Sequence, residues 1–324
     1  MKRGICLNYV NYNAAEEAMK GYKTYRSSHK SSYKCGLSIA VATLLISTTT
    51  LNVAFGAEIY LTGYRVLGGD GNELAVVEGD QVKRQWPAVA DGHAFALAVA
   101  DTVRTLPVRP PGTSPCQTCT STGAEYTLLG VPTGVTYEYP FSSWVDDIPE
   151  GTTDGKYNYA GAYFTSTVYR FSRDWTNPTE LFQVPGFYLG GIAYDATNDS
   201  LWVLDSLHLE GGQVRNYALD GTLLSAFAVS KEDGQQPFGL AVDPSDHTLW
   251  LSRMNTFAPF NSDPRLQHYS VTGQFLGEQV YPTLNGLAVI GMETVVPLPA
   301  GIWLFVSGLS IIPIFRRSHH GLEA

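Results

Sequence analysis

The sequence predicts an all-β protein: a propeller of about five four-stranded blades, or six if an N-terminal pair of strands adds one. Three observations predict this class. Of the 324 residues, 44% are hydrophobic and 12% aromatic, but only 16% are charged. Glycine (32 residues) and proline (18) are frequent, which is typical of many short strands and turns. The strongest observation is a repeat of about 48 residues, the period of a four-stranded blade.

The repeat is clearest between Gly191–Trp202 and Gly239–Trp250, which both read as an apolar strand, an Asp-rich turn and a Leu-Trp strand. Gly286–Val289 repeats the opening of this unit, and Phe95–Val99 resembles Phe238–Val242. A single sheet cannot bury two apolar faces alone, so such units must stack around an axis. The last unit is too short for four strands. We therefore expect the first strand of the body to complete the last blade.

The positions within one repeat predict where its side chains lie. Small residues should line the crowded centre: Gly191, Ala193, Gly239 and Ala241. Trp202 and Trp250 should fill the space between blades. The extra strands that would allow a sixth blade are Glu58–Leu67 and Glu73–Glu78. A two-sheet sandwich would explain the strands but not the repeat.

The N-terminal region, residues 1–57, has the order of a secretory signal. Five lysine or arginine residues lie between Met19 and Lys34, and an uncharged apolar stretch runs from Cys35 to Ala54. Small residues then predict cleavage near Gly56 or Ala57. The alternative is a retained signal anchor. Met19 is a second candidate for the true start, because acidic residues precede it.

The C-terminal region, residues 294–324, has the design of a processing signal. Its motif comprises Val296, Pro297, Leu298, Pro299 and Ala300. An apolar stretch of about 15 residues follows up to Phe315, and then Arg316 and Arg317. This stretch is shorter than the roughly 20 residues that span a bilayer comfortably, and the arginines favour the cytoplasmic side.

This tail resembles the VPLPA variety of the PEP-CTERM sorting signals of Gram-negative bacteria. The resemblance covers about 30 residues. It implies export, transient association with the inner membrane, recognition by an exosortase, and delivery to the cell surface, the outer membrane or an extracellular matrix. Seven residues follow Arg317, whereas such tails commonly end almost at once. An ordinary C-terminal membrane anchor is the alternative.

The body between these ends, residues 58–293, resembles NHL-like and lactonase-like propellers, most clearly from Gly186 to Val289. The similarity lies in the repeat and not in a catalytic signature. Between Glu58 and Val296 there are 27 acidic and 12 basic side chains. The resulting charge of −15 repels nucleic acid and anionic lipid, which are therefore not expected as partners.

Cys116 and Cys119 are the only cysteines of the expected mature protein. In an exported protein a disulfide that closes a local loop is the first interpretation. A metal or redox role and a pair of free thiols are the alternatives.

Acidic residues gather in three clusters: Asp195, Asn198 and Asp199; Asp243, Asp246 and His247; Asp146, Asp147 and Glu150. Such side chains cap tight turns by accepting hydrogen bonds from nearby backbone N–H groups, and we expect this role. Calcium binding is the alternative, and no other cofactor is expected.

Candidate catalytic groups are His93, His208, His247, His268, Asp205, Glu210 and Arg253. The body contains no nucleophile elbow, zinc-binding helix motif or phosphate loop, and each histidine is expected to be a solvated loop residue. Gly68–Gly71 is expected to form a hairpin turn.

Two classes of function are compatible with these features. The first is a non-catalytic surface or matrix protein that binds exopolysaccharide through Thr113–Gly123, Asn255–Pro264 or the Tyr-rich stretch Asp154–Tyr163. The second is an exported hydrolase or lactonase with a calcium ion in its channel. We expect the first, because the tail implies a destination and no chemistry.

The sorting motif gives the first testable prediction. Replacing Pro297–Ala300 should leave a larger product that stays in the membrane, because the exosortase recognises that motif. Fractionation and gel mobility in an exosortase-containing host would measure this. Unchanged processing would contradict the assignment.

Overall fold

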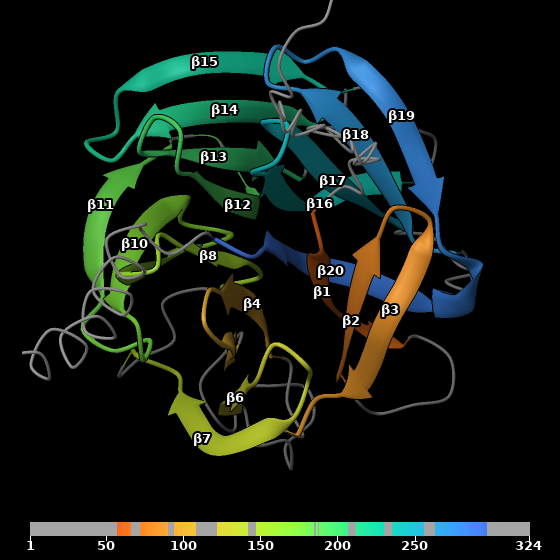
Figure 1. Ribbon diagram of the computed structural model, residues 1–324. Helices are drawn as coiled ribbons and strands as arrows, with labels where there is room; N and C mark the ends of the chain where they lie inside the picture. The colour runs from red at the N-terminus through yellow and green to blue at the C-terminus, as the bar shows by residue number, and fades with distance from the viewer. Residues whose placement is uncertain are drawn as a thin grey trace, which may run out of the picture. The chain divides into compact units, whose positions relative to one another are not determined.

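The computed structural model describes residues 57–65, 72–89, 94–107, 122–141, 147–184, 186, 188–206, 212–229, 235–255 and 263–296. All of them belong to one compact unit, Asn52–Ala324. They form five antiparallel sheets of four strands each, arranged as the blades of a propeller (Figure 1). The predicted fold class, an all-β propeller with five blades, is confirmed. The expected signal helix and C-terminal hydrophobic helix lie outside the described residues, and no helix within them is long and apolar enough to cross a membrane.

We number the blades along the chain and give each from its innermost strand outward. Blade I contains β20 (Leu287–Thr294), β1 (Ile59–Arg65), β2 (Asn72–Glu78) and β3 (Gln81–Pro87). Blade II contains β4 (Ala94–Val99), β5 (Val103–Pro107), β6 (Thr122–Tyr126) and β7 (Pro132–Glu138). Blade III contains β8 (Gly151–Thr153), β9 (Tyr157–Gly161), β10 (Thr167–Ser172) and β11 (Thr179–Gln183). Blade IV contains β12 (Leu189–Asp195), β13 (Ser200–Asp205), β14 (Gln213–Ala218) and β15 (Leu223–Ala228). Blade V contains β16 (Gln235–Asp243), β17 (Thr248–Asn255), β18 (Arg265–Ser270) and β19 (Phe275–Val280).

Ring closure joins the two ends of the body in blade I. Strand β1 pairs with β20 from Ile59 opposite Thr294 to Arg65 opposite Leu287. We expected one N-terminal strand to complete a blade built from C-terminal strands. In the structure, the three N-terminal strands β1, β2 and β3 form the blade, and the single C-terminal strand β20 completes it. The strands proposed for a sixth blade are therefore β1 and β2 of blade I. A blade that contains both ends cannot open without breaking strand hydrogen bonds.

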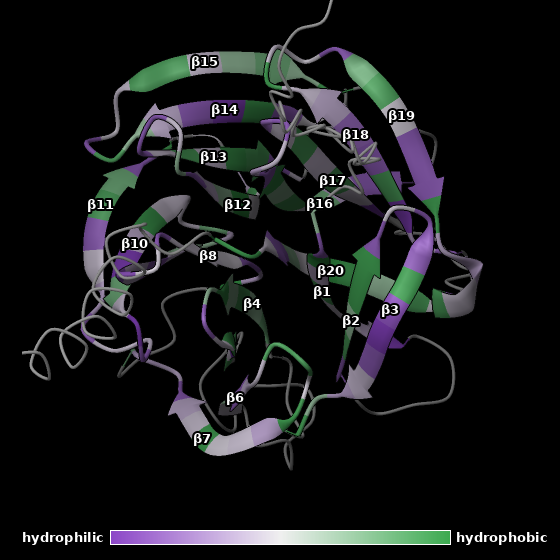
Figure 2. Cartoon of the chain, in the orientation of Figure 1, coloured by the Kyte–Doolittle hydropathy of each residue, from purple (hydrophilic) through white to green (hydrophobic). Residues whose placement is uncertain are grey.

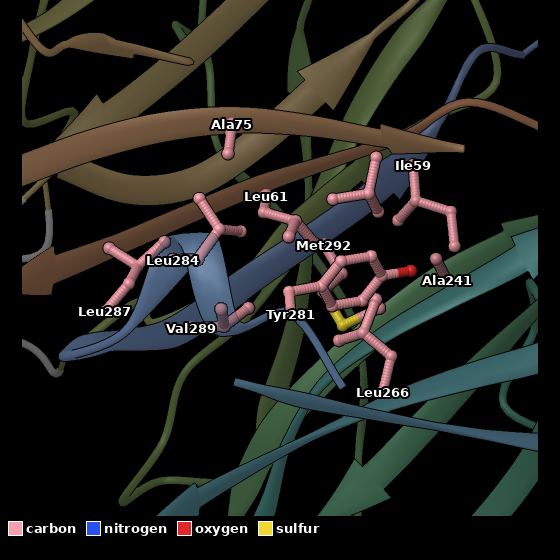
Figure 3. Packing of buried hydrophobic residues seen from close by; sticks show 11 residues of the cluster. Ile59, Leu61, Ala75, Ala241, Leu266, Tyr281, Leu284, Leu287, Val289 and Met292 are labelled. Carbon is pink, nitrogen blue, oxygen red and sulfur yellow. The ribbon is translucent and has the colours of Figure 1, made fainter. Parts of the chain in front are cut away.

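A core cluster lies at each of the five boundaries between neighbouring blades. Figure 3 shows the one between blades I and V, where Ile59 and Met292 face Ala241 and Leu266. The short 3-10 helix η2 (Pro282–Leu284) adds Leu284 to this cluster. The hydropathy of the strands explains this burial between blades. In Figure 2, β4 and β2 are largely hydrophobic, whereas β3 on the outer edge carries hydrophilic residues. Each sheet is thus buried on both faces by its neighbours.

The central strands come so close together that two of them require glycine. A Cβ atom on Gly191 would lie 2.6 Å from the carbonyl oxygen of Phe238 in the next blade. A Cβ atom on Gly239 would lie 2.9 Å from the carbonyl oxygen of Ile290 in the blade after that. Both distances are shorter than real Cβ contacts. The prediction that these two glycines line the crowded centre is confirmed.

The positions of Trp202 and Trp250 are also confirmed. Trp202 is 2% exposed and packs in the cluster between blades IV and V. Trp250 is partly buried against the cluster between blades V and I, and its ring stacks on His268 with centroids 4.1 Å apart.

Trp202 therefore provides a test of the packing between blades. Trp202→Ala should lower the free energy of unfolding by about 3–5 kcal/mol, because it removes a large ring from a closed interface. Denaturant unfolding of the purified protein would measure the change. Leu224→Ala, at a side chain 49% exposed on β15, should cost less than about 0.5 kcal/mol. Equal effects of the two substitutions would contradict the packing described here.

Candidate functional site

The side chain of Glu150 lies at the centre of the ring and binds three other blades. Glu150 precedes β8 in blade III and is 1% exposed. Its Oε2 accepts a hydrogen bond from the backbone N–H of Ile192 in β12 at 2.7 Å. Its Oε1 accepts hydrogen bonds from Leu240 in β16 at 2.9 Å and Met292 in β20 at 2.7 Å. One carboxylate thus holds the innermost strands of blades I, IV and V.

The three donors occupy equivalent positions, each directly after a glycine of an innermost strand: Gly191, Gly239 and Gly291. The alignment of Gly286 with Gly239 in the sequence is therefore wrong by five residues at this level of the ring. Gly286 instead has a φ of +80° just before β20 begins. The sequence alignment matched similar apolar residues, whereas the structurally equivalent residues are those whose N–H groups donate to Glu150.

A second buried carboxyl group, that of Glu293, lies on β20 near Glu150. It is 1% exposed, and its Oε1 accepts a hydrogen bond from the backbone N–H of Thr294 at 3.3 Å. Its Oε2 is buried and has no hydrogen-bond partner. Two carboxyl groups so close together in a nonpolar environment do not both ionise readily.

Burial raises the pKa of both carboxyl groups well above the ordinary value, and the charge of Glu293 adds to the shift at Glu150. At Glu150, three backbone N–H groups oppose the shift because they stabilise the ionised form. At Glu293, hydrogen bonds from Thr152, Thr294 and Thr153 oppose the shift in the same way. Both carboxyl groups therefore keep a proton to a higher pH than they would in water.

The surroundings of Glu150 suit an anion and not a cation. Its two oxygens are turned toward N–H donors, whereas a hard cation requires several oxygens turned toward it. Within the ranges that the structure describes, no group of three or more His, Cys, Asp or Glu side chains could hold a metal ion.

The repeated aspartates cap turns, as predicted. Asp195 Oδ1 accepts a hydrogen bond from the N–H of Thr197 at 2.9 Å, and Asp243 Oδ1 accepts one from the N–H of Ser245 at 2.8 Å. Asp195 has a further role, since its Oδ2 lies 2.8 Å from Nε2 of His247 in the next blade. The pKa of Asp195 is lowered overall: burial raises it, but hydrogen bonds to His247 and Trp202 outweigh burial.

The other residues of these clusters accept hydrogen bonds from nearby turns and loops. Asn198 Oδ1 accepts a hydrogen bond from Ser200 Oγ at 2.5 Å, and Asp199 accepts one from the hydroxyl of Tyr194 at 2.9 Å. Asp246 Oδ1 accepts a hydrogen bond from Thr248 Oγ1 at 2.6 Å. Asp147 is joined to the β9–β10 loop through its carbonyl oxygen, which accepts the N–H of Tyr163 at 2.8 Å.

The expectation that the histidines are solvated loop residues is wrong for His268. It lies on β18, where its Nε2 is 2.6 Å from Thr248 Oγ1 and its ring covers Trp250. Burial lowers the pKa of His268, and the nearby Asp246 and Asp243 oppose that shift. A strand in the middle of a blade turns alternate residues into an interface, so a histidine there is packed.

Asp205 and Arg253, two of the candidate catalytic residues, lie at or near the ends of the second strands of blades IV and V. They are buried, at 1% and 5% exposure. Arg253 donates from Nε to Gln267 Oε1 at 2.8 Å. These two residues lie at the face where the innermost strands begin, which we call the start face. His93, His208, Glu210 and Asp146 lie outside the described residues.

Aromatic rings from three blades meet at the start face. We call Tyr163, Phe164, Tyr188 and Phe238 the aromatic cluster. The ring of Tyr163 lies 4.9 Å from that of Phe164, 5.6 Å from that of Tyr188 and 6.1 Å from that of Phe238, centroid to centroid. Phe164 is 54% and Tyr188 41% exposed.

Carboxyl groups border this cluster. Burial raises the pKa of Tyr163 to about 12, and the charges of Asp205 and Asp147 contribute to the shift. The cluster therefore combines exposed ring faces with negative charge and with the hydroxyls of Tyr163 and Tyr188.

The opposite side, which we call the end face, carries a pocket of about 200 Å³. Its walls are Tyr194–Thr197, Val242, Pro244 and Thr294–Val296. Val296, the first residue of the predicted sorting motif, is 7% exposed, and its N–H donates to the carbonyl of Val99 at 3.2 Å.

Several predicted features lie outside the described residues. These are Cys116 and Cys119, the turn at Gly68–Gly71, and the motif residues Pro297, Leu298, Pro299, Ala300, Arg316 and Arg317. The stretch Asp154–Tyr163, predicted to be exposed for sugar stacking, is mostly buried. Tyr159 is 1% exposed because β9 lies inside blade III, and only Tyr163 reaches the start face.

The sequence did not indicate the structural roles of two residues at the centre of the ring, Glu150 and Glu293. Glu150 was placed in an acidic cluster, and Glu293 was not singled out. One signal in the sequence could have found Glu150. It directly precedes the glycine of an inner strand, and the equivalent position is Phe95 in blade II and Phe238 in blade V. An acid at an apolar position of a repeat indicates a special role, but not its partners.

No protein-family model matches the chain, and no curated protein matches it. The chain is similar to several solved structures. A chain of a nidogen/laminin complex is 11% identical, with a TM-score of 0.47, and the match covers 74% of this chain and 100% of that one. A streptogramin B lyase is 10% identical, with a TM-score of 0.38 and coverage of 64% and 61%. A protein of unknown function from Bacteroides caccae is 12% identical, with a TM-score of 0.38 and coverage of 74% and 99%.

The paired glutamates give a testable prediction. At neutral pH, Glu150→Gln should lower the free energy of unfolding by about 3 kcal/mol, because the amide turns N–H groups toward buried backbone donors and leaves at least one unsatisfied. Glu293→Gln should cost less than about 1 kcal/mol, because the amide oxygen can still accept the hydrogen bond from the N–H of Thr294. Denaturant unfolding would measure both.

The pH dependence tests the raised pKa values. Each of the two carboxyl groups keeps a proton in the folded protein that the unfolded chain releases above its ordinary carboxyl pKa. The stability that these protons provide is present at acidic pH and is lost as the pH rises through the raised pKa values. Glu293→Gln should make that decline shallower. Equal costs of the two variants at every pH would contradict the different roles of the two carboxyl groups.

Proposed function

We propose that this protein is an exported, exosortase-processed protein of the cell surface or extracellular matrix, and that its propeller binds a neutral polysaccharide through the aromatic cluster at the start face. The observation that carries the binding part is the convergence of Tyr163, Phe164, Tyr188 and Phe238 from blades III, IV and V. Phe164 and Tyr188 keep large exposed ring areas. An exposed group of rings on an otherwise packed propeller is typical of a binding site.

The chemistry of the cluster favours a sugar. Flat aromatic faces pack against the C–H faces of pyranose rings, and the hydroxyls of Tyr163 and Tyr188 can bond to sugar hydroxyls. Carboxyl groups of Asp147 and Asp205 border the rings and can accept further hydrogen bonds. Together with the charge of −15 between Glu58 and Val296, they repel an anionic polymer.

The positions of the chain ends support a surface role. Ala57 and Val296, the first and last described residues, both lie at the end face: Ala57 contacts Asp243 at the end of β16, and Val296 follows β20. The proposed signal and sorting segments therefore connect to the ring on one side. The aromatic cluster lies on the other side, where a tether at either end leaves it accessible.

The rigidity of the ring also suits binding. Glu150 fixes the innermost strands beneath the cluster, so the rings are held in place before a ligand arrives. A preorganised site loses less conformational entropy when it binds.

Affinity electrophoresis in gels that contain hydroxyethylcellulose tests the proposal. Wild-type protein should be retarded, and Tyr188→Ala and Phe164→Ala should each weaken retention about tenfold, since one stacked ring contributes about 1 kcal/mol or slightly more. Alginate, an anionic polymer, should give no retardation.

The matched control is Phe275→Ala. Phe275 is 52% exposed but lies on the outer strand β19, away from the cluster, so its removal should leave retention unchanged. Equal retention of all variants, or equal loss in all of them, would contradict the assigned site.

A further inference from the structure

The carboxyl group of Asp243 is buried at the end face and accepts a hydrogen bond from the first described residue. Asp243 is 1% exposed. Its Oδ1 accepts hydrogen bonds from the N–H and the hydroxyl of Ser245, at 2.8 and 2.6 Å. Its Oδ2 accepts one from the backbone nitrogen of Ala57, at 3.2 Å. A buried carboxylate requires strong donors on both oxygens.

The equivalent aspartate of blade IV shows which hydrogen-bond partners this position has in another blade. Asp195 lies 48 residues earlier in the repeat. Its Oδ2 accepts a hydrogen bond from Trp202 Nε1 at 3.1 Å and lies 2.8 Å from His247 Nε2 of the next blade. The next blade therefore contributes a side-chain ring nitrogen to this carboxylate.

Neither the tryptophan nor the histidine that contacts Asp195 has an equivalent hydrogen bond at Asp243. Trp250 takes the place of Trp202 in the repeat, but its Nε1 is buried and has no hydrogen-bond partner. The next blade offers the backbone nitrogen of Ala57 where its predecessor offers an imidazole. Asp243 Oδ2 thus has one neutral donor at the position where Asp195 Oδ2 has two donors.

We propose that Ala57 is the first residue of the mature protein and that its α-ammonium group forms an ion pair with Asp243. The inference rests on the export part of the proposed function. Hydrolysis of the bond before Ala57 adds one water molecule, giving a carboxylate on the released segment and an amine on Ala57. At neutral pH that amine is largely protonated, because α-amino groups ordinarily have a pKa near 8.

Cleavage at this bond changes the donor on Asp243 from one amide N–H to a cation with three N–H bonds. Hydrogen bonds from charged donors are about twice as strong as neutral ones. The ammonium takes the role that His247 has at Asp195. Since Ala57 leads into β1 of blade I and Asp243 ends β16 of blade V, the ion pair joins the two blades at ring closure. Removal of the signal thereby strengthens the closed ring.

Other titratable groups lie on the strands that carry this pair. On the side of blade I, Glu58 is paired with Arg84 at 2.6 Å, and burial raises the pKa of Tyr60 to about 12. On the side of blade V, His268 lies close enough for the charge of Asp243 to oppose the lowering of its pKa by burial. Asp246 lies 3.9 Å from His268.

The first experiment determines the N-terminus of the full chain after export from a Gram-negative host, by intact mass and N-terminal sequencing. The expected first residue is Ala57. An exported, cleaved protein that begins at Glu58 or at any earlier residue overturns this inference and leaves the proposed function standing. A chain that keeps its N-terminal region uncut overturns both.

The second experiment compares thermal unfolding of exported wild-type and Asp243→Asn protein between pH 7 and pH 10. Pairing raises the pKa of the amine in the folded state, so its stabilisation is present at pH 7 and is lost as the pH rises through that pKa. Asp243→Asn should melt about 3–5 °C below wild type at pH 7, and the difference should shrink by pH 10.

The matched control is Asp195→Asn, at the equivalent aspartate, whose Oδ2 is bound by ring nitrogens. No α-amine is present at that position, so its melting deficit should not shrink between pH 7 and pH 10. A deficit of Asp243→Asn that is equally constant overturns the ion pair. If either variant fails to accumulate, the N-terminal residue still decides the proposal.

Discussion

The ring depends on one carboxylate that accepts hydrogen bonds from three blades. Backbone N–H groups at the centre of a propeller cannot reach strand partners on the side of the axis, and they must find acceptors there. Glu150 supplies an acceptor to the innermost strands β12, β16 and β20 at once. Without it, buried donors from three separate blades would be unsatisfied. This constraint explains why an acid occupies a position that is aromatic in blades II and V.

The carboxylate also decides where function can lie. Because Glu150 occupies the axis at the level of the inner-strand glycines, the centre of the ring is part of the core. The exposed chemistry lies at the two faces. One face presents the aromatic cluster with its bordering carboxyl groups. The other receives both ends of the described chain and contains the pocket beside Val296.

The turn geometry is the same in each repeat, but the groups that the next blade provides to the turn aspartate differ. Asp195 and Asp243 cap the same turn with the same backbone contact, yet the next blade provides a histidine ring to the first and a backbone nitrogen to the second. The difference arises because blade I is assembled from both ends of the body and begins where the other blades have a turn. Ring closure is therefore the place where the repeat departs most from its pattern.

The sequence by itself determined the fold class, because a 48-residue period of strands with apolar residues on both faces has few packed solutions. It also determined Gly191 and Gly239 at the centre, Trp202 between blades and the aspartate-capped turns, since these depend on local size and hydrogen bonding. Only the tertiary structure decided the roles of Glu150 and Glu293, the His247–Asp195 contact and the aromatic cluster. Each joins residues from different blades, and such contacts depend on how the blades are placed around the axis, which no local pattern records.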